Sequence, residues 1–231
     1  MPTRALILSC MQSQNRFCSL SNVIFDLDGT LIDSAPSILE CFRATLKKKG
    51  CLTVVNLDNS LVGPPLRDTI KLLANERDPI KIDALVEEFK FQYDQGICNL
   101  ALPYFGISEL LSELKIANKN IYIVTNKRHY PTKKIIASMG WEKLVDGIYT
   151  IDYPSVHLEK KSSVLNQLLA DFSLSKEAAC YVGDRFDDWE AAKENGLQFV
   201  HALWGYGALD KVISNSCSVD NPNQLRNLLI K

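Results

Sequence analysis

The chain has 231 residues, of which 46% are apolar and 23% are charged, and its formal net charge is −1. This composition is typical of a soluble globular protein with one sizeable domain, or one domain with an insertion. The balanced charge gives no electrostatic basis for binding nucleic acid or an anionic membrane, and no apolar run approaches the roughly 20 residues of a membrane span. Seven cysteines without a CxxC pair argue against a metal or disulfide framework and predict a reducing, cytoplasmic location.

The first 20 residues contain one short apolar patch, at positions 5–8, which is too short for a signal peptide. We therefore expect residues 1–20 to be a frayed N-terminal extension, or to include a start placed upstream of a native start at Met11. Folded structure is expected from Ser21 onward.

The rest of the chain is organised around the stretch from Val23 to Leu31, with the sequence VIFDLDGTL. Its first three residues are apolar and β-favouring, as in a parallel-sheet strand that is buried on both faces. Asp26 and Asp28 follow at a spacing of two, so an extended backbone would place both carboxylates on one side of the strand end. Two like charges so close together are costly unless a cation or a shared proton relieves them. Gly29 then allows a turn or the close approach of a ligand.

Residues 34–101 are predicted to be entirely helical. One helix starts near Ser34 and is stopped by Gly50, and amphipathic segments follow from about Leu66 and from about Ile82. A loop with the sequence VGPPL separates the first two segments. These helices are expected to form a module of their own.

From residue 102 onward, strand patterns alternate with helical ones. The predicted strands are 121–124, 147–151, 179–182 and 198–201, and the predicted helices are 107–114, 131–139, 164–172, 187–195 and one that starts at Pro222. This alternation is typical of a parallel, doubly wound sheet, and the gap between the first strand and the second is too long for one crossover. We therefore predict an α/β fold with a Rossmann-like doubly wound parallel sheet, built from 21–33 and 102–231, into which 34–101 are inserted as an all-helical domain.

Polar side chains follow three of the predicted strands at the point where each strand ends. Asp26 and Asp28 follow the first strand, Thr125 and Asn126 the second, and Asp184 the fourth. Each of these alone is also compatible with a turn or a helix cap. Open α/β sheets bind ligands at this edge, and an oxygen-rich site made of three aspartates suits a hard cation such as Mg²⁺.

Four motifs occur in a fixed order: DLDGTL at 26–31, TN at 125–126, a lysine near 160, and GDRFDD at 183–188. Together they resemble the haloacid dehalogenase superfamily. The insertion after the first motif is similar to the subclass with a helical cap, and the overall likeness is to phosphoglycolate phosphatase-like hydrolases. The resemblance implies a Mg²⁺-dependent phosphatase, a phosphoric monoester hydrolase, that acts on a small phosphorylated metabolite.

The resemblance also implies a role for each matching acidic residue. Asp26 would be the nucleophile that forms an aspartyl-phosphate, and Asp28 would be the general acid and then the general base. Mg²⁺ would be held by Asp26, the main-chain carbonyl of Asp28 and Asp184. Asp188 would support this set of metal ligands.

Further residues would bind the substrate. Thr125 and Asn126 would donate hydrogen bonds to the phosphoryl oxygens, whose charge must be stabilised during transfer. The motif lysine departs from the usual family pattern, since Lys160 and Lys161 both lie at its position; the match to a K-x-x-V-[IL] variant favours Lys161. Arg67, in the loop of the insertion that resembles the core-facing cap loop, is a candidate contact for a substrate anion, or an ordinary surface arginine of a helix.

Other activities stay open at this point. A sugar phosphomutase-type phosphotransferase, a nucleotidase or a pyrophosphatase of the same family, a phosphonate-cleaving enzyme and a non-catalytic phospho-ligand-binding protein are alternatives. Asp28 argues against a dehalogenase, because a departing halide needs no proton donor. The sequence determines neither the substrate nor whether the protein is a monomer or a homodimer.

Overall fold

The computed structural model describes residues 16–53, 55–153, 160–207 and 217–230. At its centre lies a sheet of six strands in the order β5-β4-β1-β6-β7-β8, and every neighbouring pair is parallel. The strands are β1 (Asn22–Phe25), β4 (Asn120–Thr125), β5 (Gly147–Thr150), β6 (Ala179–Gly183), β7 (Gln198–Ala202) and β8 (Cys217–Val219). The predicted α/β fold with a doubly wound parallel sheet is therefore confirmed.

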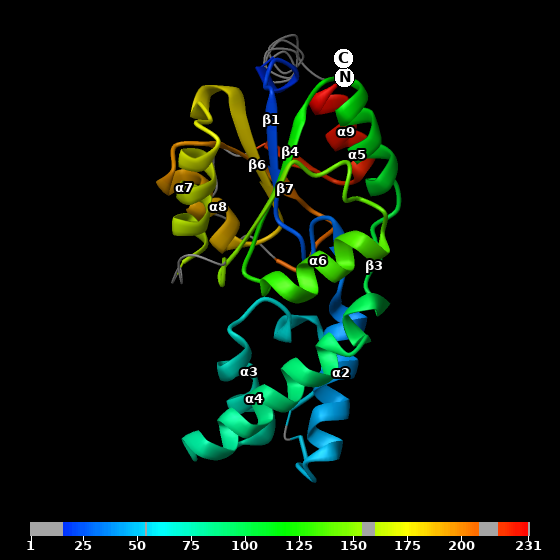
Figure 1. Cartoon of the computed structure of the whole chain (residues 1–231), viewed down its shortest axis with the longest axis vertical. Helices are drawn as coiled ribbons and strands as arrows, with labels where there is room; N and C mark the ends of the chain where they lie inside the picture. The colour runs from blue at the N-terminus through cyan, green and yellow to red at the C-terminus, as the bar shows by residue number, and fades with distance from the viewer. Residues whose placement is uncertain (1–15, 54, 154–159, 208–216, 231) are drawn as a thin grey trace, which may run out of the picture.

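Helices cover both faces of this sheet, so it has a core on each side (Figure 1). They are α5 (Ile107–Ile116), α6 (His129–Ser138) and α9 (Pro222–Leu229) on one face, and α7 (Lys161–Asp171) and α8 (Phe186–Glu194) on the other. Successive residues of a strand point to opposite faces. In β1, Val23 and Phe25 accordingly belong to the core beneath α5 and α9, whereas Ile24 belongs to the core beneath α7 and α8.

Between positions 34 and 101 the described residues form helices and loops but no strand. The elements are α2 (Ala35–Lys48), the 3₁₀ turn η1 (Asn59–Leu61), α3 (Leu66–Ala74), α4 (Pro79–Asp94) and the 3₁₀ turn η2 (Ile97–Leu100). The rings of Phe42 and Phe89 join α2 to α4 with their centroids 4.7 Å apart. This group of helices lies beyond the edge of the sheet where β1 and β4 end (Figure 1).

The chain enters and leaves the helical group through two short paired strands. These are β2 (Ile32–Asp33) and β3 (Leu102–Pro103), which are antiparallel, with Ile32 opposite Pro103. We propose that the boundary between a sheet-containing core and a helical cap lies at this pair.

One local expectation was wrong, because the backbone is not extended through Asp28. Strand β1 ends at Phe25, and the carbonyl of Leu27 then accepts a hydrogen bond from the N–H of Ile32 at 3.1 Å. This turn satisfies backbone groups that an extended segment would have left without a partner in the sheet. Asp26 and Asp28 consequently have different neighbours, instead of lying on one side of a strand.

Part of the N-terminal segment also differs from the expectation. Phe17 and Leu20 are buried in the core, and the Lys119 ammonium donates a 2.6 Å hydrogen bond to the carbonyl of Cys18. Residues 16–20 are therefore packed instead of frayed, while residues 1–15 lie outside the described part of the chain.

Two further elements differ from the prediction. Helix α6 begins at His129, two residues earlier than predicted, because the Asp152 carboxylate accepts the N–H of His129 at 2.7 Å. Strand β8 was not predicted, since three residues are too few for a recognisable alternation. In the described part of the chain, no helix has the length and apolarity needed to cross a membrane.

Candidate active site

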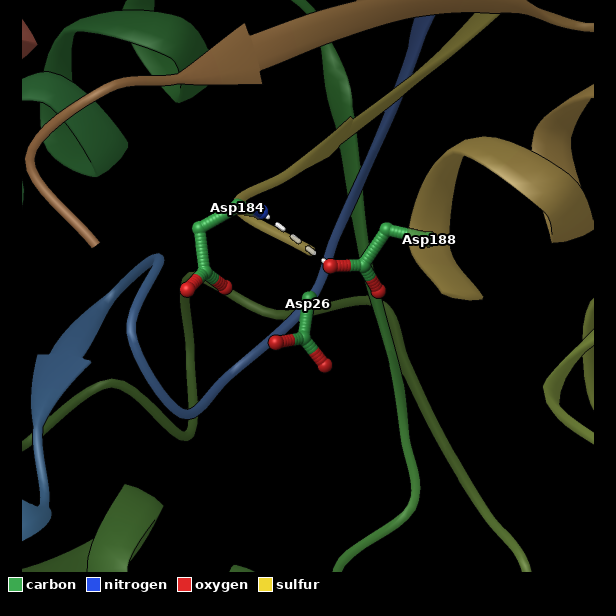
Figure 2. A group of neighbouring side chains, drawn as sticks. All are labelled: Asp26, Asp184 and Asp188. Carbon is green, nitrogen blue, oxygen red and sulfur yellow. Dashed lines mark hydrogen bonds between the residues drawn. The ribbon is translucent and has the colours of Figure 1, made fainter. Parts of the chain in front are cut away.

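Three buried aspartates meet at the carboxyl edge of the sheet. Asp26 follows β1, Asp184 follows β6, and Asp188 lies in the first turn of α8 (Figure 2). One oxygen of each carboxylate lies within 4.8 Å of the others, and the three residues are at most 2% exposed. The structure therefore brings together three of the predicted metal-site residues.

Lys161, the first residue of α7, places its ammonium inside this group. Its Nζ lies 3.0 Å from Oδ1 of Asp26 and 2.5 Å from Oδ1 of Asp188. Burial alone would lower the pKa of Lys161, but the carboxylates of Asp188 and Asp26 outweigh it and hold the pKa well above its ordinary value. The neighbouring Lys160 is exposed. Of the two candidate lysines, Lys161 is thus the one at the aspartates, in its charged form.

Asp188 holds the start of α8 in place beside the site. Its Oδ2 accepts the backbone N–H of Asp184 at 3.1 Å and that of Arg185, the N-cap residue of α8, at 2.9 Å. Burial raises the pKa of Asp188, and the charge of Lys161 offsets part of that rise. Asp188 therefore joins the end of β6 to the aspartate group and to the lysine.

Asp184 is enclosed by the loop that follows β7. Its Oδ2 accepts the N–H groups of Tyr206 at 2.8 Å and Gly207 at 3.2 Å, and the Thr30 hydroxyl donates to its Oδ1 at 3.2 Å. On the other side lies Gly29, whose φ is +87° and where a Cβ would come within 2.4 Å of the Asp184 carboxylate. Burial, and then the nearby Asp188 charge, raise the pKa of Asp184 to about 6.

Asp28 lies apart from the three clustered aspartates, and its carboxylate faces a different cation. Nζ of Lys127 lies 3.1 Å from Oδ1 of Asp28, and both side chains are largely buried. The two atoms form an ion pair but no well-aligned hydrogen bond, and this oxygen has no other hydrogen-bond partner among the described residues. The carboxylate thus retains the capacity to exchange a proton with a bound molecule.

The predicted phosphate-binding pair lies at the end of β4. Thr125 is buried, and its hydroxyl accepts the N–H of Lys127 at 3.2 Å. Asn126 is exposed, and its side-chain amide donates a 2.9 Å hydrogen bond to Asp187. Both residues therefore lie at the edge of the sheet where the aspartates meet.

The structure does not bring Arg67 to the aspartates. Its guanidinium pairs with Asp83 on the adjacent helix α4, and both side chains are about half exposed. A different arginine reaches from the core to the helical group: Nη1 of Arg185 donates a 2.8 Å hydrogen bond to the carbonyl of Val62.

The charges of the site fit a divalent cation. Asp26, Asp184 and Asp188 contribute three carboxylates, which Lys161 alone compensates from within the group. Burial raises the pKa of Asp26 well above its usual range, because the lysine offsets only part of the cost of burying that charge. Clustered carboxylate oxygens are the ligands that Mg²⁺ prefers, and two uncompensated negative charges match its charge.

Three contributors to the site were not among the predicted residues. Lys127 pairs with Asp28, Asp187 accepts from Asn126 and lies 3.4 Å from the Lys161 ammonium, and Tyr206 donates to Asp184. Lys127 directly follows the TN motif, so its charge was a usable signal. Tyr206 contributes its backbone N–H, which no side-chain pattern can reveal.

Comparison with known proteins agrees with this geometry. Residues 23–202 match the family model of haloacid dehalogenase-like hydrolases. A phosphoglycolate phosphatase from Xanthomonas campestris pv. campestris is 34% identical over 188 residues, covering 80% of this chain and 83% of the relative. The tyrosine-protein kinase PtkA from Mycobacterium tuberculosis is 29% identical over 85% of this chain and 67% of its own length. Among solved structures, a haloacid dehalogenase-like hydrolase from Streptococcus pneumoniae has a TM-score of 0.78 at 27% identity, covering 90% of this chain and 97% of that one.

The chain belongs to the haloacid dehalogenase-like hydrolase family. The predicted family is therefore confirmed, and so is the predicted enzyme class, a phosphatase of this family.

Proposed function

We propose that this enzyme is a Mg²⁺-dependent phosphatase that hydrolyses a small phosphomonoester through an aspartyl-phosphate on Asp26. The observation that carries the proposal is the buried group formed by three aspartates and a lysine: Asp26, Asp184, Asp188 and Lys161. The carboxylate of Asp28 is not part of this group and pairs with Lys127 instead. A nucleophile and a proton-transfer group need different surroundings, and these two aspartates have them.

The reaction would proceed in two steps carried by the two aspartates. A carboxylate oxygen of Asp26 attacks phosphorus, the bond to the ester oxygen breaks, and Asp28 donates a proton to that leaving oxygen. Asp28 then removes a proton from water, whose oxygen attacks phosphorus and releases inorganic phosphate from Asp26. Thr125, Asn126 and Lys161 would hold the phosphoryl oxygens during both steps.

Mg²⁺ would be held by Asp26, the main-chain carbonyl of Asp28 and Asp184, with Asp188 supporting them. When bound, it would neutralise negative charge on the phosphoryl group and on the carboxylates. The Lys161 ammonium contacts the carboxylates of both Asp26 and Asp188 and so reduces the repulsion between them. The backbone N–H of Tyr206 fixes the direction of the Asp184 carboxylate.

The helical group would act as a cap that excludes water and contacts the rest of the substrate. The Arg128 guanidinium binds both carboxylate oxygens of Asp94, at 2.9 and 2.6 Å, and so joins the start of α6 to the end of α4. On the other side, Arg185 binds the carbonyl of Val62. These two contacts hold the helices against the edge of the sheet where the reaction would occur.

The experiment is phosphate release from a panel of phosphomonoesters, with Mg²⁺ and with a chelator, for the wild type and for Asp26→Asn. The variant is nearly isosteric but lacks a nucleophilic carboxylate, so we expect at least a 10³-fold loss of turnover. The panel includes 2-phosphoglycolate, because curated relatives are named phosphoglycolate phosphatases. It also includes a hexose 1-phosphate, a nucleoside monophosphate and pyrophosphate.

The panel distinguishes the alternatives of the same family. Isomerisation of the hexose phosphate without phosphate release would identify a phosphomutase. Preference for the nucleotide or for pyrophosphate would identify a nucleotidase or a pyrophosphatase. A cytoplasmic location and a monomeric or homodimeric state stay predictions.

A further inference from the structure

Tyr206 contacts two parts of the protein that lie far apart in the chain. Its backbone N–H donates a 2.8 Å hydrogen bond to Oδ2 of Asp184, the proposed metal ligand after β6. Its side-chain hydroxyl donates a 2.6 Å hydrogen bond to Oδ1 of Asp33 and accepts the N–H of Ala35 at 2.8 Å. Asp33 ends β2 and Ala35 begins α2, so the hydroxyl lies where the chain leaves the core for the helical group.

The hydroxyl of Tyr206 is a firm donor at this junction. Burial, and then the hydrogen bond with Asp33, raise the pKa of Tyr206 well above its ordinary value, so the hydroxyl keeps its proton. Oδ1 of Asp33 also accepts the N–H of Ala35 at 3.3 Å, which closes a ring of hydrogen bonds around the first residue of α2. Removal of the hydroxyl would therefore loosen the start of α2 without removing the aromatic ring.

The second connection of the helical group contacts the same loop. The ring of Trp204 meets the ring of Tyr104, which directly follows β3, edge to face with centroids 6.5 Å apart. The indole Nε1 of Trp204 donates a 3.0 Å hydrogen bond to the carbonyl of Thr30, whose hydroxyl donates to Oδ1 of Asp184. Residues 204–206 are thus in contact with both connections of the helical group.

This loop has little room to move independently of Asp184. A Cβ at Gly205 would lie 2.2 Å from the Cβ of Asp184, and a Cβ at Gly207 would lie 2.3 Å from its carbonyl oxygen. Segments packed this closely transmit a displacement instead of absorbing it. A shift of Tyr206 would therefore turn the Asp184 carboxylate, and a misdirected ligand binds a metal ion more weakly.

We propose that Tyr206 is a positioning residue that couples the junction of the helical group, at β2 and α2, to the metal ligand Asp184. This inference rests on the proposed function, from which it takes Asp184 as a Mg²⁺ ligand. The hydroxyl sets the position of Tyr206 from the junction, and the backbone N–H of the same residue sets the direction of the carboxylate. Because coupling between two sites is reciprocal, Mg²⁺ bound at Asp184 would in turn stabilise the start of α2.

The test is Mg²⁺ binding by isothermal titration calorimetry, for the wild type and for Tyr206→Phe. The variant keeps the ring and the N–H that binds Asp184 but lacks the hydroxyl at the junction. We expect Mg²⁺ to bind about 3- to 10-fold more weakly, less than the roughly 10- to 100-fold loss on removing a direct partner of a ligand. In activity assays, saturating Mg²⁺ should restore most of the kcat of Tyr206→Phe, because the variant acts on metal affinity.

Further variants separate this coupling from a loss of stability. Asp33→Ala should weaken Mg²⁺ binding as Tyr206→Phe does, whereas Asp33→Asn retains an oxygen that can accept the hydroxyl and should keep most of the wild-type affinity. Tyr149→Phe is the matched control, because it also removes a tyrosine–aspartate hydrogen bond, to Asp171 at 2.5 Å, but on strand β5. It should leave Mg²⁺ affinity unchanged.

Hydrogen exchange measures the reciprocal effect without turnover. Mg²⁺ should slow amide exchange in peptides that contain residues 33–42 of the wild type, and the slowing should be smaller in Tyr206→Phe. Equal Mg²⁺ dissociation constants for the wild type, Tyr206→Phe and Asp33→Ala would overturn the inference and leave the proposed function standing. An equal loss of affinity in Tyr149→Phe would also overturn it.

The proposed function fails by a different result. Mg²⁺ binding to the wild type without phosphate release from any phosphomonoester would overturn the phosphatase function, but not the coupling, which is measured by binding and exchange. Absence of Mg²⁺ binding to the wild type would overturn both.

Discussion

The backbone N–H of Tyr206 donates a 2.8 Å hydrogen bond to the carboxylate of Asp184, 22 residues earlier in the chain. Gly205 makes this approach possible, since a Cβ at that position would lie 2.2 Å from the Cβ of Asp184. The loop after β7 thereby fixes the direction of a carboxylate that we propose as a metal ligand.

Gly205→Ala should therefore weaken Mg²⁺ binding as well as stability. The added methyl group displaces either the loop or Asp184, and we expect a loss of about 1–3 kcal/mol in the free energy of unfolding. Isothermal titration with Mg²⁺ and denaturant unfolding measure the two effects. Gly140→Ala is a control with a positive φ and nothing within 4 Å of the added Cβ, so it should cost about 1 kcal/mol and leave Mg²⁺ affinity unchanged.

Lys161→Met and Lys160→Met should differ strongly in activity and in stability. The first removes a buried ammonium from between Asp26 and Asp188, and breaking such a pair costs about 3 kcal/mol at neutral pH without metal. It should also lower kcat at least 10²-fold, because the phosphoryl group loses a cation. The second changes an exposed side chain and should alter kcat by less than twofold, so equal effects would contradict the assignment of Lys161.

In metal-free buffer, stability should depend on pH through Asp184. Its pKa is about 6 in the folded protein and near 3.8 when unfolded, so the folded state holds more protons between these values. Stability therefore falls as the pH rises from about 4 to about 6, by on the order of 1–3 kcal/mol. Asp184→Asn should not show this fall in stability with rising pH, and it should be more stable than the wild type at pH 7.

Added Mg²⁺ should reverse that order. At pH 7 the cation should raise the melting temperature of the wild type but have little effect on Asp184→Asn, because a ligand carboxylate is missing. An Asp184→Asn protein that is no more stable than the wild type at pH 7 without metal would contradict the proposed cost of burying this charge.

Asp28→Asn should separate the two steps of the reaction. With p-nitrophenyl phosphate the leaving group departs without a proton donor, so phosphoryl transfer to Asp26 should still occur. Hydrolysis of the intermediate lacks its base and should stall. We expect a burst of p-nitrophenol close to one equivalent of enzyme, followed by turnover at least 10²-fold slower than that of the wild type, as measured by stopped-flow absorbance. Steady turnover at the wild-type rate would contradict the role of Asp28.

The sequence was sufficient to predict the parts of this structure that follow from regular patterns. The apolar runs before Asp26, Thr125 and Asp184 predicted parallel strands, and the structure places all three residues at strand ends on one edge of the sheet. Insertion of a helical segment after β1 followed from the length of the gap before the second strand. These features depend on periodicity and chain length, which a single sequence contains.

Contacts between distant loops could not be predicted in this way. Lys127 faces Asp28 because the turn at Leu27 redirects the chain after β1, and periodicity says nothing about the path of such a turn. Arg67 was selected by its place in a loop, but pairing with Asp83 depends on how two helices pack. The match to the K-x-x-V-[IL] pattern, in contrast, favoured Lys161 over Lys160, and Lys161 is the residue that begins α7 beside the aspartates.

The most direct test of the central claim is to locate the phosphoryl group during turnover. Asp28→Asn is mixed with p-nitrophenyl phosphate and Mg²⁺, quenched in acid, digested and examined by peptide mass spectrometry. The account predicts one phosphoryl group on the peptide that contains Asp26, and none when Asp26→Asn is combined with Asp28→Asn. A phosphoryl group on another residue, or none in either protein while p-nitrophenol is released, would contradict it.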